Sequence, residues 1–232
     1  MGKKEGGVRT RITAGELEEV ALFATLSAAQ REHVAREASV ESIAPGGLYF
    51  SERAASTGFH VLLSGRVKLF KVAEDGKEQI IYIFGPGEPF CLCSVFSDGK
   101  HPANLAALES SRVLVLAPRQ FERLSKEDPA LLLVLLQVMS RRLKEAMEMI
   151  DALSLKQIPS RIAAYFLTHA RGESVRLGVT HREFAKIIGV TPETLSRTLT
   201  KMAKMGLIEQ RDGEIRMLDR QLLEGCRDGT CA

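Results

Sequence analysis

Apolar residues change their spacing along this chain, and the changes divide it into parts. From about Ala14 the spacing is helical, with a break near Leu26 and Ser27 where a second short helix can be capped. From Val40 to about Leu116 the pattern becomes short apolar runs separated by glycine turns, as in "GFHVLLSG" and "KEQIIYIFGPG". Several short strands at this spacing predict a compact antiparallel barrel or sandwich.

Two shorter stretches carry local signals. Residues 1–12 are basic and lack periodicity, which predicts a mobile tail. Asp75 and Gly76 form a dipeptide typical of a tight hairpin inside the strand-rich region.

A long helix is predicted over residues 129–155. Its apolar positions alternate steps of four and three residues, and this 3.5-residue period over three heptads is typical of a two-stranded coiled coil. We therefore expect a homodimer, while a helix packed only on its own barrel is the alternative. The predicted seam consists of Leu132, Leu136, Met139, Leu143, Ala146, Ile150 and Leu153.

Residues 179–208 predict a helix-turn-helix. Thr180 and Glu183 have the spacing of a capping box, and Gly189 permits a tight turn out of the first helix. Thr191 can cap the second helix, with Pro192 at its first position and a glycine at its end. The next segment, "LIEQRDGEIRML", predicts two strands around Asp212-Gly213, a hairpin wing beside the second helix.

One face of the second predicted helix carries chemistry suited to DNA. Glu193, Ser196 and Arg197 fall at i, i+3 and i+4 near its N-terminus, the end that meets base edges in this motif. Arginine can bind guanine in a bidentate way, glutamate can accept from cytosine, and serine is adaptable. Glu193 and Arg197 could instead form an intrahelical ion pair worth roughly 0.2–0.5 kcal/mol, and such a pair could also orient Arg197. Predicted phosphate contacts are Thr180, His181, Thr191 and Thr194.

Charge and composition support a nucleic-acid partner only weakly. The whole chain has a net charge of +3, and residues 155–232 hold 13 Lys or Arg against 9 Asp or Glu. A well-solvated surface explains this surplus equally well. The longest apolar run, residues 130–139, is too short to span a bilayer and no signal peptide is evident, so we expect a cytoplasmic protein without a membrane partner.

Over nearly its whole length the chain resembles the CRP/FNR transcription regulators, and "ETLSR" matches the E-x-x-S-R recognition pattern of the FNR-like branch. The resemblance implies an α+β fold with an N-terminal cyclic-nucleotide-binding-type β-roll (a jelly roll) over 13–128, a dimerisation helix over 129–155 and a winged helix-turn-helix over 156–232. It also implies palindromic sites with TTGA-type half-sites. Pro192 stands where the cyclic AMP receptor branch has an additional base-reading arginine, so that contact is lost here.

The resemblance disfavours cyclic AMP as the effector. Cys91-Leu92 and Pro102-Ala103 occupy the positions of the family's G-E and R-S phosphate ligands, and neither pair supplies the required charge. Ala146 and Met147 occupy the long-helix positions that contact adenine in the cyclic AMP receptor. A regulator responding to a cyclic nucleotide or another small metabolite is the alternative.

A haem or thiol-based sensor of nitric oxide, carbon monoxide or redox state is our hypothesis for the effector domain. "PFCLCS" resembles the "FC-x-H-S" stretch of the carbon-monoxide-sensing haem regulator, with Cys91 at its cysteine and Cys93 at its histidine. His101 and His60 are further potential ligands, and no metal is assigned. Simple space-filling by the two cysteines is an equally good explanation. The oxygen sensors' iron-sulfur cluster is disfavoured because no cysteine precedes Cys91.

The sequence thus predicts a DNA-binding regulator rather than an enzyme, because no P-loop, nucleophile elbow or paired-carboxylate signature is present. Double-stranded DNA, a second copy of the chain, a small-molecule or gas effector and, for an activator, RNA polymerase are the expected partners. A cyclic-nucleotide-binding module without DNA function would leave the helix-turn-helix and wing unexplained. Cys226 and Cys231 could form a redox pair, but a flexible polar end is the better interpretation.

Overall fold

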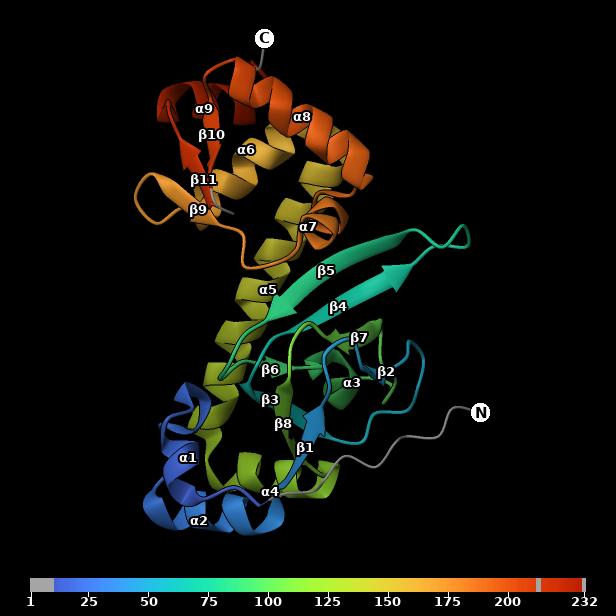
Figure 1. Cartoon of the computed structure of the whole chain (residues 1–232). Coiled ribbons are helices and arrows are strands. Elements are labelled where there is room, and N and C mark those ends of the chain that lie inside the picture. Colours follow the sequence, from blue (N-terminus) through green and yellow to red (C-terminus); the bar gives the residue numbers. More distant parts are fainter. Residues whose placement is uncertain (1–10, 212–213, 231–232) are drawn as a thin grey trace. The chain divides into compact units, whose positions relative to one another are not determined.

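The computed structural model describes residues 11–211 and 214–230, and they form two compact units (Figure 1). Among these residues, the first unit comprises residues 11–77 and Ile81–Leu143, and the second comprises Glu78–Ile80, residues 144–211 and residues 214–230. The predicted mobile tail lies mostly outside the described residues. Ile12 at its end is buried in the core of the first unit, so the prediction is wrong for that residue.

The first unit begins with short capped helices. As predicted, a break near Leu26 and Ser27 separates them, since Leu26 is buried and Ser27 caps the following helix. The Ser27 Oγ accepts from the backbone N–H of Gln30 at 3.3 Å, and the Gln30 side chain accepts from the N–H of Ser27 at 2.8 Å. The elements are α1 (Ala14–Glu18), the 3₁₀ turn η1 (Ala21–Phe23) and α2 (Ala28–Glu37).

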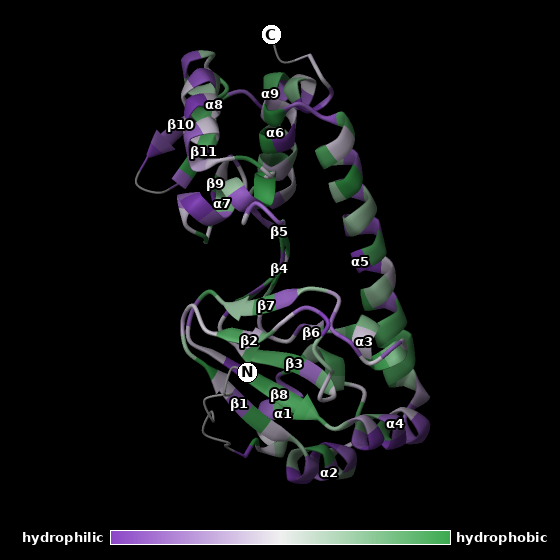
Figure 2. Cartoon of the chain, turned by 90° about the vertical axis from the view of Figure 1, so that its right-hand side faces the viewer, coloured by the Kyte–Doolittle hydropathy of each residue, from purple (hydrophilic) through white to green (hydrophobic). Residues whose placement is uncertain are grey.

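Two four-stranded sheets form the predicted β-roll. Their strand orders are β1-β8-β3-β6 and β2-β7-β4-β5. The hydrophobic residues of β3 and β8 stand out in Figure 2, and inward-facing side chains such as Leu62, Leu105 and Val113 fill the space between the sheets. The predicted hairpin at Asp75 and Gly76 forms, with Gly76 at φ 81°. The strands are β1 (Ser39–Ile43), β2 (Leu48–Phe50), β3 (Phe59–Ser64), β4 (Val67–Val72), β5 (Glu78–Phe84), β6 (Pro89–Phe90), β7 (Asn104–Ala107) and β8 (Ser111–Leu116).

Three helices complete this part of the chain: α3 (Leu92–Phe96), α4 (Pro118–Glu127) and α5 (Pro129–Leu155). The long helix α5 has the bounds that the apolar period predicts. Its first turns pack on the N-terminal helices, where Leu131 and Leu135 are buried. The first turns of α5 therefore pack on their own domain, which was the alternative to a helix that packs only on a second chain.

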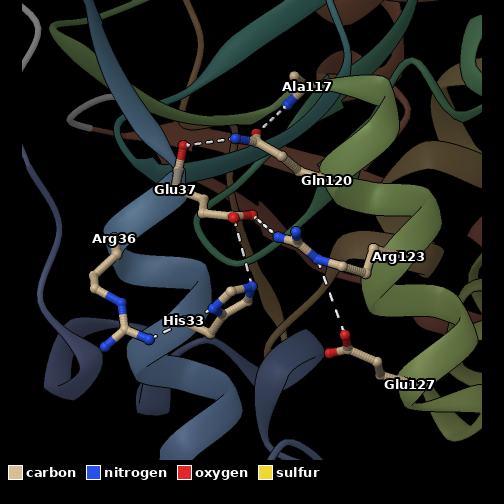
Figure 3. Close-up of polar contacts among 7 residues, drawn as sticks. All are labelled: His33, Arg36, Glu37, Ala117, Gln120, Arg123 and Glu127. Atoms are coloured by element: carbon tan, nitrogen blue, oxygen red, sulfur yellow. Dashed lines mark hydrogen bonds and ion pairs between the residues drawn. The ribbon is translucent and has the colours of Figure 1, made fainter.

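A polar network joins α2 to α4 (Figure 3). The Glu37 carboxylate accepts from Arg123 and lies 3.5 Å from the Nε2 of His33. Gln120 donates to the backbone carbonyl of Glu37 at 3.2 Å and accepts from the N–H of Ala117 at 2.8 Å. Because these groups are partly exposed, the ion pairs add little stability.

The second unit is a winged helix-turn-helix. Its elements are α6 (Ile158–His169), β9 (Ser174–Arg176), α7 (His181–Ile188), α8 (Pro192–Lys204), β10 (Ile208–Arg211), β11 (Glu214–Met217) and α9 (Arg220–Arg227). The predicted wing strands are β10 and β11, and β9 adds a third strand in the order β10-β11-β9. The predicted turn at Asp212-Gly213 lies outside the described residues. The α+β fold class is confirmed.

The C-terminal segment differs from the flexible end that its polar composition predicts. The carboxylate of Asp219 accepts from the N–H of Leu222 at 2.9 Å and starts α9, which packs along α6. Leu223 and Cys226 are buried in the core of the unit, and Cys226 is disulfide-bonded. The prediction of a flexible end is thus wrong for Cys226, because two inward-facing apolar side chains one helical turn apart hold α9 in place. Cys231 lies outside the described residues.

No helix among residues 11–211 and 214–230 is long and apolar enough to cross a membrane.

Candidate DNA-reading surface and sensor cluster

The first helix of the motif, α7, begins and ends as its sequence predicts. The Thr180 Oγ1 accepts from the N–H of Glu183 at 3.2 Å, and the Glu183 carboxylate accepts from the N–H of Thr180 at 3.0 Å. Gly189 ends the helix in the left-handed region at φ 79°. A Cβ added there would lie 2.9 Å from the Cδ2 of Leu153, closer than real Cβ contacts come. The positive φ therefore favours glycine at this turn, and a larger residue would also have to displace the end of the Leu153 side chain.

The second helix, α8, is held by its cap and by its apolar face. The Thr191 Oγ1 accepts from the N–H of Thr194 at 3.3 Å, and Pro192 occupies the first position. Leu195, Leu199 and Met202 face the core, which the neighbouring helices complete. The remaining core residues of α6 and α7 include Ile162, Phe166, Phe184 and Ile188. Burial of this face fixes which side of α8 is turned to solvent.

The predicted base-reading residues share the solvent side of α8. Glu193, Ser196 and Arg197 are all exposed in its first two turns. Hydrogen bonds from its own backbone N–H and from the Thr191 hydroxyl lower the pKa of Glu193, and the nearby Arg197 and Arg182 lower it further. The carboxylate is therefore ionised at neutral pH and available as an acceptor.

The predicted phosphate-contacting residues lie at the N-termini of the two helices. Thr180, His181 and Thr191 are exposed, and Thr194 is half-buried. Arg182, which the sequence did not single out, is exposed in the first turn of α7, and its charge acts on Glu193. Its position two residues after a predicted N-cap is the signal that could have identified it.

The predicted seam of α5 is largely uncovered in the single chain. Leu143 and Ile150 are 65% and 64% exposed, which is unusual for large aliphatic side chains along one helix. Leu132, Leu136, Met139 and Ala146 are also exposed, and Leu153 is half-buried. Met147, expected near an effector together with Ala146, is likewise exposed. This part of α5 therefore presents an apolar surface.

In the β-roll, Cys91 links β6 to α3 and lies inside the domain. Its backbone adopts the left-handed conformation at φ 60°, which is uncommon for a residue with a side chain. Burial raises the pKa of its thiol, and the neighbouring Cys93 raises it further. Cys93 is an exposed free thiol on α3. The two cysteines therefore have opposite surroundings although they are two residues apart.

The buried histidines lie close to Cys91. His101 stacks on Phe50 with 3.6 Å between ring centroids, and its Nδ1 lies 3.5 Å from the Oγ of Ser94. That Oγ donates to the backbone carbonyl of Cys91 at 2.7 Å, so Ser94 connects Cys91 to His101. The sequence did not predict a role for Ser94, because its link to His101 joins separate segments of the chain.

His60 belongs to the same group of rings. Its ring stacks on Phe90 at 5.3 Å and lies 6.2 Å from the ring of His101. The His60 Nε2 is 3.2 Å from the Oγ1 of Thr57. We call Cys91 and the surrounding rings the sensor cluster; it consists of Tyr49, Phe50, His60, Phe90, Cys91 and His101.

Haem is one of the two versions of the effector hypothesis, and the sensor cluster contains side chains of the types that ligate haem iron. The thiol of Cys91 and the imidazoles of His60 and His101 are buried, and the two imidazole rings stack directly on Phe90 and Phe50. Within the described part of the chain, no three His, Cys, Asp or Glu side chains are grouped to hold a metal ion. Ligation by Cys91 would require its buried thiol to lose a proton.

Comparisons with known proteins agree with this architecture. The model of the Crp-like helix-turn-helix domain matches residues 160–226, and that of the cyclic nucleotide-binding domain matches residues 40–128. The chain is 30% identical over 166 residues to the "Cyclic AMP receptor protein" of Thermus thermophilus, covering 71% of this chain and 77% of that protein. It is 28% identical over 201 residues to the "Nitrogen fixation regulation protein FixK" of Bradyrhizobium diazoefficiens, covering 83% and 82%.

Among solved structures, a mutant of CooA from Carboxydothermus hydrogenoformans has a similar fold. Its TM-score is 0.75 at 22% identity, covering 93% of this chain and 96% of that one. The fold and the matched domains define a DNA-binding transcription regulator with an effector-binding domain. The chain belongs to the CRP/FNR family of such regulators, and its curated relatives named above are regulators rather than enzymes.

Proposed function

We propose that this regulator binds as a homodimer to a palindrome with TTGA-like half-sites about one helical turn apart. The main support for this proposal is the exposed group of side chains at the N-terminal end of the capped helix α8: Glu193, Ser196 and Arg197. These side chains supply an ionised acceptor, an adaptable hydroxyl and a bidentate donor for base edges in the major groove. Thr180, His181, Thr191 and Thr194, joined by Arg182, would contact the adjoining phosphates.

Arg197→Ala tests the base-reading role. If Arg197 contacts guanine, the substitution weakens binding to the palindrome by about 1–3 kcal/mol and changes binding to random DNA much less. Fluorescence anisotropy on both DNAs at one salt concentration measures this difference. Lys204→Ala is the matched control, because Lys204 is exposed at the opposite end of the same helix and should affect both DNAs alike. Equal losses on both DNAs for Arg197→Ala would make it a phosphate contact.

The dimer part of the proposal is supported by the exposed apolar seam of α5. Leu143→Asp should raise the dimer dissociation constant strongly, because a carboxylate would be buried against the partner helix. Lys144→Asp introduces the same side chain at the next, exposed position and should leave dimerisation nearly unchanged. Analytical ultracentrifugation distinguishes the two. Equal sedimentation of Leu143→Asp and the parent protein would reject the seam.

For the effector, we propose haem-based or thiol-based sensing of nitric oxide, carbon monoxide or redox state at the sensor cluster. Supporting observations are the strained backbone of Cys91, its link through Ser94 to His101, and the nearby imidazole of His60. Bound haem would supply an iron atom that binds diatomic gases. Reconstitution with haem followed by absorption spectroscopy tests this. No Soret shift on adding carbon monoxide or nitric oxide would reject the haem version.

Cyclic AMP sensing is a second candidate, favoured by 30% identity to a protein named as a cyclic AMP receptor. Pro102 and the buried apolar Ala103 stand at the expected phosphate-ligand positions, so the charge needed for a cyclic phosphate is missing there. We therefore expect isothermal titration calorimetry with cyclic AMP to show no saturable binding. Contact with RNA polymerase is expected if the regulator is an activator.

A further inference from the structure

The C-terminal part of α9 contains a disulfide whose partner follows from the cysteine content of the chain. Cys226 is disulfide-bonded and only 1% exposed. The chain has four cysteines, and Cys91 and Cys93 are free thiols of the β-roll. Cys231 is then the cysteine that remains for Cys226 within the chain. Disulfides are uncommon in the reducing compartments where proteins bind DNA, and those that occur there are mostly transient or redox-sensing.

The turn after α9 brings the chain back toward Cys226. The N–H of Gly229 donates to the carbonyl of Cys226 at 3.2 Å, and the N–H of Thr230 donates to that of Gly225 at 2.9 Å. With Gly229 in the left-handed region at φ 98°, these two bonds form a Schellman motif. The Thr230 hydroxyl donates to the same carbonyl of Gly225 at 2.6 Å. A cysteine directly after Thr230 is therefore well placed to bond to Cys226.

Helix α9 depends on a small number of interactions. It has eight residues, its buried side chains are Leu223 and Cys226, and it packs along α6. A helix this short is unstable alone, and Gly225 in its interior lowers its helical propensity further. A covalent bond at Cys226 restricts the conformations of the undocked segment, so it should favour the docked helix.

The buried position of Cys226 also determines how the disulfide can be reduced. Asp228, Gly229 and Thr230 are exposed, whereas Cys226 is buried. A thiolate of a dithiol reductant would therefore attack the partner sulfur, forming a mixed disulfide and releasing Cys226 as a thiolate that takes up a proton. The second thiol of the reductant then attacks the mixed disulfide. Two electrons and two protons pass to the two cysteines, which end as thiols, and the reductant becomes a disulfide.

We propose that Cys226 and Cys231 form a disulfide that a dithiol reductant opens, and that the oxidised bond holds the last turn of α9 in the core of the second unit. Because a buried thiolate is a poor leaving group, this turn has to open before the first exchange step. The proposed exchange involves neither the sensor cluster nor the α5 seam, so it is independent of the proposed effector and of the dimer.

Hydrogen exchange in the full-length protein tests the effect on α9. Peptides covering residues 220–230 are read by mass spectrometry in the oxidised protein and after reduction by dithiothreitol. We expect reduction to speed exchange of these amides about tenfold or more, while β3 and β8 stay unchanged. Cys231→Ser should exchange like the reduced parent in both conditions. Cys93→Ser is the matched control, because it removes an exposed free thiol and should keep the difference.

The rate of reduction by dithiothreitol tests whether the last turn of α9 must open. Gly229→Ala strains this turn, because φ 98° disfavours a side chain although nothing lies within 4 Å of the added Cβ. Gly172→Ala is the matched control, with φ 66° and equally open space in the turn before β9. We expect Gly229→Ala to speed reduction about fivefold or more and Gly172→Ala to leave it unchanged.

Peptide maps of the unreduced protein should show Cys226 linked to Cys231 of the same chain. A link to a second chain, or a free Cys226 thiol, would overturn the proposal. Equal exchange of α9 in the oxidised and reduced parent would also overturn it, as would equal reduction rates for Gly229→Ala and Gly172→Ala. These measurements need neither DNA nor an effector, so their failure is separate from a failure of the protein to bind the palindrome.

Discussion

The winged helix-turn-helix unit, called the DNA-reading unit below, and the β-roll differ in how far their candidate site residues are exposed. Glu193, Ser196 and Arg197 project into solvent from a capped helix, whereas Cys91 and His101 are buried beside aromatic rings. A surface that binds a charged polymer needs exposed donors and acceptors that are already ionised. Burial lowers the reactivity of a thiol, and this is the restraint that the proposed sensing at Cys91 would need.

This contrast is accompanied by separate cores. Phe184 is fully buried in the second unit, and Phe90 occupies the core between the sheets of the first. Each core consists of residues from its own unit, so each unit should have its own stability. The largest expected effects test this separation.

Phe184→Ala should destabilise the DNA-reading unit by about 3–5 kcal/mol, because a large cavity replaces a buried ring. Hydrogen exchange in increasing urea, read peptide by peptide, should show early opening of α7 and α8 while β3 and β8 keep their protection. Phe90→Ala is the reciprocal control and should open the sheets first. Simultaneous opening of both regions in either variant would mean that the two units unfold together.

Two glycines, one at the end of α7 and one after α8, offer a sharper test within the DNA-reading unit. Gly189 and Gly206 have similar positive φ angles, so alanine at either should be strained by roughly 1–3 kcal/mol. Only at Gly189 would the new Cβ approach Leu153 at 2.9 Å, while nothing lies within 4 Å of it at Gly206. Gly189→Ala should therefore lower the melting temperature of the unit more than Gly206→Ala. Equal losses would show that Leu153 moves aside freely.

The two thiols of the β-roll allow a direct comparison of buried and exposed chemistry. Burial raises the pKa of Cys91, and each unit of pKa reduces the thiolate fraction about tenfold. Maleimide should therefore label Cys93 more than about tenfold faster than Cys91 in the folded protein. Labelling in urea is the control, because unfolding should bring the two rates together. Equal rates in the folded protein would make Cys91 an accessible thiol.

These differences also explain what the sequence could predict. The Thr180–Glu183 capping box, the Gly189 turn and the α8 face each depend on residues within a few positions, so local spacing sufficed. The sensor cluster joins β2, β3 and the segment after β6, and its stacking of His101 on Phe50 depends on long-range packing. The helix α9 was missed because its short apolar pattern lies in a polar segment, and its packing on α6 is visible only in the fold.

The smallest expected effect concerns how Glu193 is kept ionised. Its folded-state pKa is lowered, so the stabilisation that its carboxylate gives is present above the usual value of about 4.3 and is lost as pH falls through the lowered pKa. Binding to the palindrome should therefore not change through titration of Glu193 between about pH 5 and 8, since that group is already ionised there. Glu193→Gln should show the same pH dependence in this range, with weaker binding throughout.

Carboxyl-carbon NMR titration can identify the cause of the lowered pKa. The hydrogen bonds from its own N–H and from the Thr191 hydroxyl lower the pKa of Glu193 more than the attraction of Arg197 does. Thr191→Ala should therefore raise this pKa more than Arg197→Gln does. Arg182→Gln should raise it least. A larger effect of Arg197→Gln would mean that the intrahelical ion pair, rather than the helix cap, holds the carboxylate. Arg197 would then have to leave Glu193 before reading a base, and the exposed reading surface would be less preorganised than its caps indicate.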